Sequence, residues 1–285
     1  MKKSGLCVVL ILFVMNEGFS QISTFPRLSA NKIWTSKNHF DTPESVIFDE
    51  TRKIIYVSNI SGEPREKNGS GFISKLSSNG IIEELKWVDG LHAPKGMCIY
   101  NNSLYVTDIN EVVEISLEEG KIINRYKSKE AEFLNDITVT EGGTIYVSDN
   151  VITKIFTIDK FKLVVWINNK EMSLPNGLYA AKDELLIGND GYILSVNYKT
   201  KETEKIISNT GFIDGLEKYS DGVFIISDFS GKVQLVDLKN GRKVLFDTSL
   251  NEIMAADIDY VMSEQLLLVP TFYNNSIVAY IISQK

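Results

Sequence analysis

Residues 174–190 read LPNGLYAAKDELLIGND, in which a turn signature and a short apolar stretch are followed by a polar turn and a second apolar run. Five other segments begin in the same way: TPESVIFD at Thr42, APKGMCIY at Ala93, FLNDITVT at Phe133, FIDGLEKY at Phe212 and AADIDYVM at Ala255. A second and a third β-rich run follow each of them. Because Val, Ile, Tyr, Thr and Phe dominate these runs while Gly, Asn and Asp separate them, the pattern predicts strands joined by hairpins.

The spacing of the six segments indicates how the strands are organised. The third residues of the segments are separated by 51, 40, 41, 38 and 43 positions, and they are Glu44, Lys95, Asn135, Asn176, Asp214 and Asp257. Repeats of roughly 40–50 residues with several strands each are typical of β-propellers, and a solenoid would need shorter or helical repeats. We therefore predict an all-β, six-bladed propeller whose last blade is completed by the strand NKIWTS, residues 31–36. Closing the ring in this way covers both faces of the apolar inner strands.

The N-terminus has the features of a signal peptide. Lys2 and Lys3 precede the apolar run GLCVVLILFVM, and Gly18 and Ser20 are small residues suited to a cleavage site before Gln21. The run is shorter than the roughly 20 residues that cross a bilayer. We expect residues 1–20 to be removed and residues 21–285 to form one propeller domain, exported to the periplasm or secreted, with no membrane association after cleavage.

Charge and cysteine content narrow the classes of partner. The chain has 30 Lys and Arg residues against 37 Asp and Glu residues, and its formal net charge is −7. A negative surface repels phosphate backbones, so nucleic acid is not expected as a partner. Cys98, within the run GMCIY, is expected to be a buried small hydrophobic residue rather than a nucleophile. We expect a monomer that acts on a small-molecule substrate.

The six segment positions are candidates for a functional site. Inner strands of a propeller point the same way along its axis, so equivalent residues form a ring at one mouth of the channel. Three carboxylates and two amides in such a ring, with Lys95 as the sixth member, would attract a hard divalent cation. Ca²⁺ is the expected ion, with Mg²⁺ and Mn²⁺ as alternatives, because zinc prefers His or Cys ligands. The same Asn-Gly and Asp-Gly pairs are also ordinary turn formers, which leaves a propeller without metal as the alternative.

Over residues 40–284 the chain resembles the senescence marker protein, gluconolactonase and luciferin-regenerating enzyme family, which is similar to paraoxonase-type calcium propellers. The resemblance rests on Glu44 in PES, Asn135 in LND, Asn176 in LPNGL and Asp214 in IDGL. It implies that Glu44, Asn176 and Asp214 bind the metal, that Asn135 contacts metal or substrate, and that Asp214 is the catalytic base.

Three residues or pairs depart from the family pattern. Ser45-Val46 stands where the family has Gly-Pro, a difference that concerns the backbone path of the first blade. Phe133 replaces an arginine suited to sugar lactones, and this replacement favours a less polar substrate. Lys95 stands where paraoxonases have a catalytic histidine. It would either orient an anionic substrate or neutralise a ring carboxylate and compete with the metal.

A histidine and a polar loop near the predicted ring each have two interpretations. His92, three residues before Lys95, is either a proton shuttle that contacts substrate or a solvated loop histidine. The loop ISGEPREKNGSG, residues 60–71, is either a lid or a solvated hairpin tip. Asp108, Asp149 and Asp228 are interpreted as turn caps.

These features lead to two hypotheses. In the first, the chain is a metal-dependent hydrolase of a lactone or related ester, in which Asp214 or Asp257 accepts a proton from water. In the second, it is a non-catalytic exported propeller that binds a small molecule, a glycan or a protein.

Overall fold

The computed structural model describes residue 25 and residues 27–284, which contain 23 strands and two short 3₁₀ helices. The predicted signal peptide, residues 1–20, lies outside the described residues. Within the described part of the chain, no helix is long and apolar enough to cross a membrane. The all-β class predicted from the repeats is confirmed.

The strands form four hydrogen-bonded sheets. A four-stranded sheet contains β2 (Pro43–Asp49), β3 (Ile54–Asn59), β4 (Gly71–Ser77) and β5 (Ile82–Leu91). An eight-stranded sheet contains β6 (Pro94–Tyr100), β7 (Ser103–Asp108), β8 (Glu111–Ser116), β9 (Lys121–Lys127), β10 (Leu134–Val139), β11 (Ile145–Asp149), β12 (Lys154–Asp159) and β13 (Lys162–Asn168).

The second half of the chain forms the other two sheets. A seven-stranded sheet contains β14 (Leu178–Ala180), β15 (Glu184–Gly188), β16 (Asp190–Asn197), β17 (Thr203–Ser220), β18 (Val223–Asp228), β19 (Lys232–Asp237) and β20 (Gly241–Asp247). The last sheet has the order β1 (Leu28–Thr35), β23 (Ile277–Gln284), β22 (Leu266–Pro270) and β21 (Asp259–Val261). The 3₁₀ helices are η1 (Ser249–Asn251) and η2 (Phe272–Asn274).

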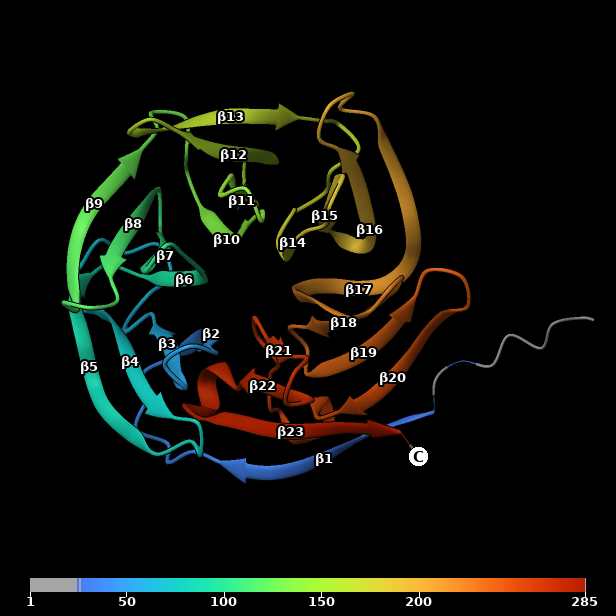
Figure 1. Ribbon diagram of the computed structural model, residues 1–285, viewed down its shortest axis with the longest axis horizontal. Coiled ribbons are helices and arrows are strands. Elements are labelled where there is room, and N and C mark those ends of the chain that lie inside the picture. The colour runs from blue at the N-terminus through green and yellow to red at the C-terminus, as the bar shows by residue number, and fades with distance from the viewer. Residues whose placement is uncertain (1–24, 26, 285) are drawn as a thin grey trace, which may run out of the picture.

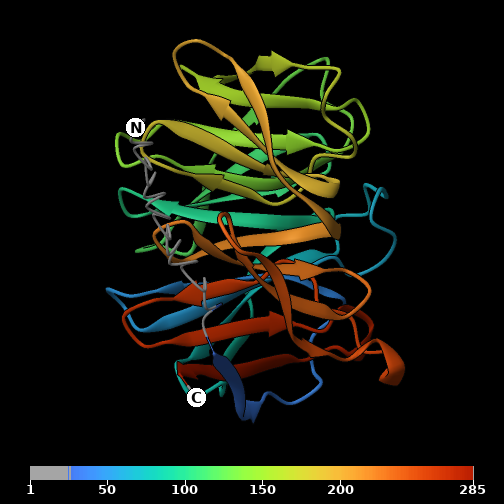
Figure 2. The same ribbon diagram turned by 90° about the vertical axis from the view of Figure 1, so that its right-hand side faces the viewer.

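Figure 1 shows these strands in radial runs around a central axis, with β2, β6, β10, β14 and β21 nearest the centre. From the side, the strands run across the molecule from one face to the other (Figure 2). This arrangement is a β-propeller. The eight-stranded sheet consists of two antiparallel runs that meet at one parallel pair, Lys162 and Lys127. In the seven-stranded sheet, β17 pairs with β16 through its first half and with β18 through its second half.

The predicted closure by an N-terminal strand is confirmed. Strand β1 pairs antiparallel with β23, in a register that places Leu28 opposite Gln284 and Thr35 opposite Val278. Since β23 would otherwise have an unpaired edge, this contact joins the two ends of the chain in one sheet.

The core lies between neighbouring sheets. One buried cluster packs Phe48 and Val57 of the first sheet against Leu266, Leu268 and Ala279 of the last. Similar clusters fill the other spaces between strand runs, which explains why the inner strands are apolar on both faces. Cys98 is 5 % exposed within one of these clusters, and burial raises the pKa of its thiol, so it is a core residue as predicted.

Candidate functional site

Five of the six ring residues line one cavity of about 170 Å³ at the axis. They are all buried, and they are Glu44, Lys95, Asn135, Asn176 and Asp214. Glu44, Lys95 and Asn135 lie on the innermost strands β2, β6 and β10, Asn176 lies just before β14, and Asp214 lies in β17. The repeat therefore brings together five side chains from segments up to 170 residues apart in sequence.

Carboxylates at the ends of the second strands hold the loops that enter these inner strands. Asp108 accepts hydrogen bonds from the backbone N–H groups of His92 and Ala93, and Asp149 accepts them from Glu132 and Phe133. Their interpretation as turn caps is confirmed. Asn59 and Asn189 occupy corresponding places and accept from the N–H groups of Asp41 and Ser173. These contacts fix the backbone immediately before Glu44, Lys95, Asn135 and Asn176, whereas Asp214 lies within the continuous strand β17.

Four phenylalanines surround the polar residues of the cavity. Its lining contains Phe133, Phe212, Phe229 and Phe272, together with Ile60 and Pro64. The rings of Phe229 and Phe272 meet edge to face, with centroids 5.0 Å apart. The sequence interpretation singled out Phe133 alone, although Phe212 has the same place in its repeat, two residues before Asp214. Because Pro64 belongs to the loop of residues 60–71, that loop forms part of the cavity wall.

Two buried oxygens in the cavity have no hydrogen-bond donor among the described residues. The side-chain Nδ2 of Asn176 donates to Asp214 Oδ1 at 2.5 Å, which leaves Asn176 Oδ1 as an acceptor without a partner. Glu44 Oε2 is the second such atom. A buried acceptor left unpaired costs about 1–3 kcal/mol. Carboxylate and amide oxygens are the ligands that Ca²⁺, Mg²⁺ and Mn²⁺ prefer, so this residue set fits a hard divalent cation.

Burial makes ionisation of the cavity carboxylates costly. It raises the pKa of Asp214 to about 7, against the opposing hydrogen bond from Asn176. Burial, followed by repulsion from Asp214, raises the pKa of Glu44 well above its usual value, while Lys95 opposes that shift. A bound cation would stabilise the ionised forms of both groups.

Lys95 does not form an ion pair with either carboxylate. Its ammonium donates to the backbone carbonyls of Ala93 at 3.0 Å and Pro64 at 3.3 Å, and it lies 4.4 Å from the ring centroid of Phe133. Burial lowers the pKa of Lys95 to about 8, and the Glu44 carboxylate opposes that shift.

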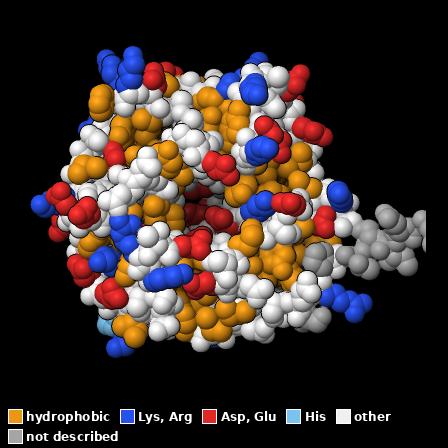
Figure 3. Space-filling model, in the orientation of Figure 1, with side chains coloured by type: hydrophobic (Ala, Val, Ile, Leu, Met, Phe, Trp, Pro, Cys, Tyr) orange, Lys and Arg blue, Asp and Glu red, His pale blue; other side chains and the backbone are white. Residues whose placement is uncertain are grey.

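The prediction that Asp257 belongs to the ring is wrong, because its side chain lies outside the cavity that the other five residues line. It lines a different cavity of about 370 Å³ together with Asp136, Glu217 and Asp259, and it accepts a hydrogen bond from Ser45 Oγ at 2.6 Å. Figure 3 shows one face of the molecule with a central hollow that contains acidic side chains.

A one-residue offset in the last repeat explains the position of Asp257. Thr107, just before Asp108, donates to the carbonyl of Asn135, and Ser227, just before Asp228, donates to the carbonyl of Ala256. Ala256 is therefore the structural equivalent of Asn135. Asp257 corresponds to Asp136, which lines the same cavity as Asp257.

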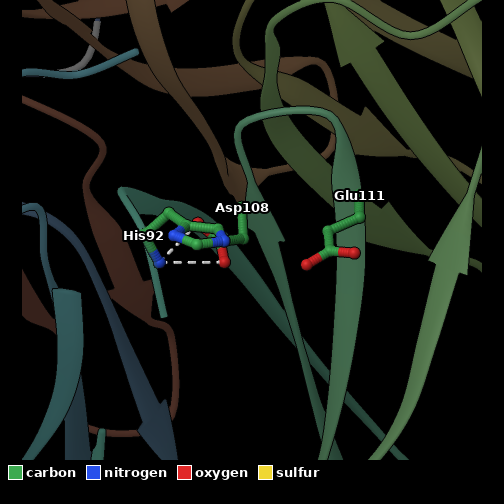
Figure 4. A group of neighbouring side chains, drawn as sticks. All are labelled: His92, Asp108 and Glu111. Atoms are coloured by element: carbon green, nitrogen blue, oxygen red, sulfur yellow. Dashed lines mark hydrogen bonds between the residues drawn. The ribbon is translucent and has the colours of Figure 1, made fainter. Parts of the chain in front are cut away.

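His92 lies outside the lining of the cavity that holds Lys95. Its Nδ1 accepts from the backbone N–H of Gly69, and Figure 4 shows the ring beside Asp108 and Glu111. The ligand atoms of these three residues lie within 4.8 Å of one another. Both carboxylates already have partners, since Asp108 caps the backbone and Glu111 pairs with Arg125 and Lys127. Burial alone would raise the pKa of Glu111, but the hydrogen bonds from Lys127 and Arg125 lower it.

The chain matches no protein family model. It is similar to strictosidine synthase-like protein 3 from Arabidopsis thaliana, with 25% identity over 207 residues that cover 66% of this chain and 47% of the relative. The chain thus spans about half the length of this curated relative.

Among solved structures, a catalytically inactive virginiamycin B lyase from Staphylococcus aureus with quinupristin superposes with a TM-score of 0.61 at 14% identity, covering 90% of this chain and 99% of the lyase. A streptogramin B lyase gives a TM-score of 0.61 at 12% identity, covering 90% and 97% of the two chains. At these identities the two lyases support the propeller fold alone. These comparisons do not show the senescence marker protein and gluconolactonase family.

Proposed function

We propose that this chain is a metal-dependent hydrolase of a lactone or related ester. The observation that carries the proposal is the pair of buried, unpaired oxygens, Glu44 Oε2 and Asn176 Oδ1, in one cavity with Asp214. Glu44, Asn176 and Asp214, with Asn135, would hold a divalent cation. When bound, such an ion polarises a carbonyl and stabilises negative charge on its oxygen. Ca²⁺ suits this all-oxygen set best, with Mg²⁺ and Mn²⁺ as alternatives.

The residues of the chain supply the remaining steps. Asp214, oriented by the Asn176 amide, accepts a proton from the water whose oxygen attacks the carbonyl carbon. The bond to the alkoxy oxygen then breaks, and that oxygen takes up the proton, so that ester and water yield acid and alcohol. The four phenylalanines exclude bulk water, and Asn135 orients the substrate.

Replacing Asp214 tests the mechanism. Wild-type protein is expected to hydrolyse members of a panel of lactones and phenyl esters in a chelator-sensitive reaction. Asp214→Asn should lower kcat by about 10²–10⁴-fold, the usual contribution of a general base. Asp259→Asn is the matched control, because Asp259 is a buried carboxylate whose side chain lines the other cavity, and it should leave kcat unchanged. Full activity of Asp214→Asn would refute the mechanism.

The buried ammonium of Lys95 favours a second candidate function. A cation beside the expected metal site suits a propeller that binds a small molecule, a glycan or a protein without turnover. Elemental analysis separates the two candidates. A stoichiometric divalent ion in protein purified without added metal supports the hydrolase, and its absence together with no turnover supports the binding protein.

We also propose that the four sheets be counted as six blades, by dividing the eight-stranded sheet at its one parallel pair and the seven-stranded sheet within β17. The mature chain would be a monomer exported after loss of residues 1–20. The relatives are named as a synthase-like protein and as lyases, so the shared fold does not choose the reaction.

A further inference from the structure

One side of the candidate cavity carries a buried positive charge that forms no direct ion pair with a described residue, although Glu44 and Asp108 attract it from a longer distance. Lys95 is 2 % exposed, and its ammonium is bound by two neutral backbone carbonyls. In the part of the chain that the structure describes, its ammonium is within 4.0 Å of no Asp or Glu oxygen. A buried charge without a counterion is costly, so the site gains stability from an anionic ligand.

Arg65 is a second cation beside the same phenylalanine ring, although its side chain is exposed and does not line the cavity. Its guanidinium carbon lies 4.6 Å from the ring centroid of Phe133, and Lys95 Nζ lies 4.4 Å from the same centroid. Phe133 itself lines the cavity. The ring thus contacts two like charges that repel each other, and an anion bound beside them would relieve that repulsion.

The charges of the residues that line the cavity also favour an anionic ligand. Glu44 and Asp214 together are balanced by one divalent cation, as the proposed function requires. Lys95 is then the cation among the lining residues that no carboxylate of the described chain contacts, and the exposed Arg65 lies over Phe133 outside that lining. A site with this charge favours an anion over a neutral molecule of equal shape.

The size and walls of the cavity limit the rest of the ligand. Its volume of about 170 Å³ is below the roughly 300–1,000 Å³ of pockets for drug-sized molecules, so the ligand is small. Phe212, Phe229 and Phe272 provide apolar contact surface for the remainder of the molecule.

We infer that the substrate is a small organic anion with an apolar or aromatic body, whose carboxylate is bound by Lys95 and Arg65 beside Phe133. Lys95 is the specificity-determining residue that selects the charged molecule over its neutral counterpart. This inference rests on the proposed function, because it takes the charges of Glu44 and Asp214 to be balanced by a cation.

The test compares benzoate with benzamide, which have nearly the same shape but differ in charge. Isothermal titration calorimetry on the full chain with CaCl₂ should show that benzoate binds at least tenfold more tightly than benzamide. Lys95→Met, which keeps the length of the side chain, should abolish this preference and leave the affinity for benzamide unchanged. Lys95→Arg should retain the preference, and Arg65→Met should reduce it.

Controls separate this role from direct binding of benzoate to the metal and from loss of the fold. Lys67→Met removes a loop cation that contacts Asn110 and does not line the cavity, so it should keep the full preference. Circular dichroism checks that each variant is folded. Equal binding of the two probes by wild-type protein, or an undiminished preference in folded Lys95→Met, would overturn the inference.

The outcomes also distinguish the inference from the proposed hydrolase. Chelator-sensitive hydrolysis of phenyl acetate with equal binding of benzoate and benzamide would leave the hydrolase standing and refute the anion site. A Lys95-dependent preference for benzoate in a protein that hydrolyses no ester would support the anion site and refute the hydrolase.

Discussion

The buried carboxylates predict that the metal-free protein loses stability as the pH rises. Burial raises the pKa of Asp214 from 3.8 to about 7, so the folded state holds its proton more tightly than the unfolded state does. The contribution of this group to stability is complete below pH 3.8 and is lost as the pH rises through 7. At about 1.36 kcal/mol for each pKa unit, Asp214 alone lowers the free energy of unfolding by about 4 kcal/mol across that interval.

A bound cation should oppose this loss, because it binds the ionised carboxylates. A ligand at 100 times its dissociation constant adds about 2.7 kcal/mol to the free energy of unfolding. For a domain of this size, that corresponds to roughly 5–10 °C in Tm. We therefore expect Tm in chelator to fall between pH 5 and pH 7.5, and added CaCl₂ to raise Tm most at the higher pH.

Two variants assign the effect to its site. Asp214→Asn is neutral at every pH, so its stability in chelator should depend less on pH, and its response to CaCl₂ should disappear. Asp259→Asn is the matched control, since the pKa of Asp259 is also raised to about 7 by burial, but its side chain lines the other cavity, of about 370 Å³. It should also weaken the pH dependence while leaving the CaCl₂ response intact. A wild-type Tm in chelator that is constant or rises between pH 5 and pH 7.5 would refute the reasoning.

Two further predictions concern the fold. Leu104→Ala, at a fully buried position between sheets, should lower the free energy of unfolding by about 2–5 kcal/mol, whereas Ile123→Ala, which is 48 % exposed, should change it little when both are measured by urea denaturation. Gly211→Ala should be more destabilising than Gly222→Ala. Both glycines have positive φ, which costs roughly 1–2 kcal/mol in alanine, but a Cβ at Gly211 would also lie 2.1 Å from Asp228 Oδ2, while none lies within 4 Å at Gly222. Equal thermal stability of the two variants would contradict the importance of that contact.

Much of the propeller could be predicted because every repeat contains the same local signals. Turn residues and β-rich runs recur at a nearly constant spacing, and a ring follows when each unit needs a neighbour to cover its apolar strands. The joining of two groups of antiparallel strands into one eight-stranded or seven-stranded sheet could not be predicted from the sequence. It depends on single contacts, such as the pair Lys162 and Lys127, and on the continuity of β17 through Gly211, where φ is +82°.

The prediction of the site succeeded where the repeats keep one register and failed where they do not. Glu44, Lys95, Asn135, Asn176 and Asp214 line one cavity because they occupy the same position in their repeats. Asp257 does not, because successive side chains of a strand point to opposite sides and a shift of one residue exchanges them. The alignment of AADIDYVM could not reveal this shift, since it depends on the hydrogen bond from Ser227 to the carbonyl of Ala256.

The same shift bears on the chemistry of the cavity. With Ala256 in the sixth ring position, the polar ring is interrupted, and Ala256 packs in one apolar cluster with Ile60 and Phe272, to which Phe229 is also joined. Three members of that cluster, Ile60, Phe229 and Phe272, line the cavity itself. A substrate that uses the whole site must therefore place an apolar group against this wall while its charged group reaches Lys95. A sugar lactone, with hydroxyls on every side, would leave polar groups unpaired against that wall, so the ring that lacks Asp257 favours the apolar anion inferred from Lys95 and Arg65.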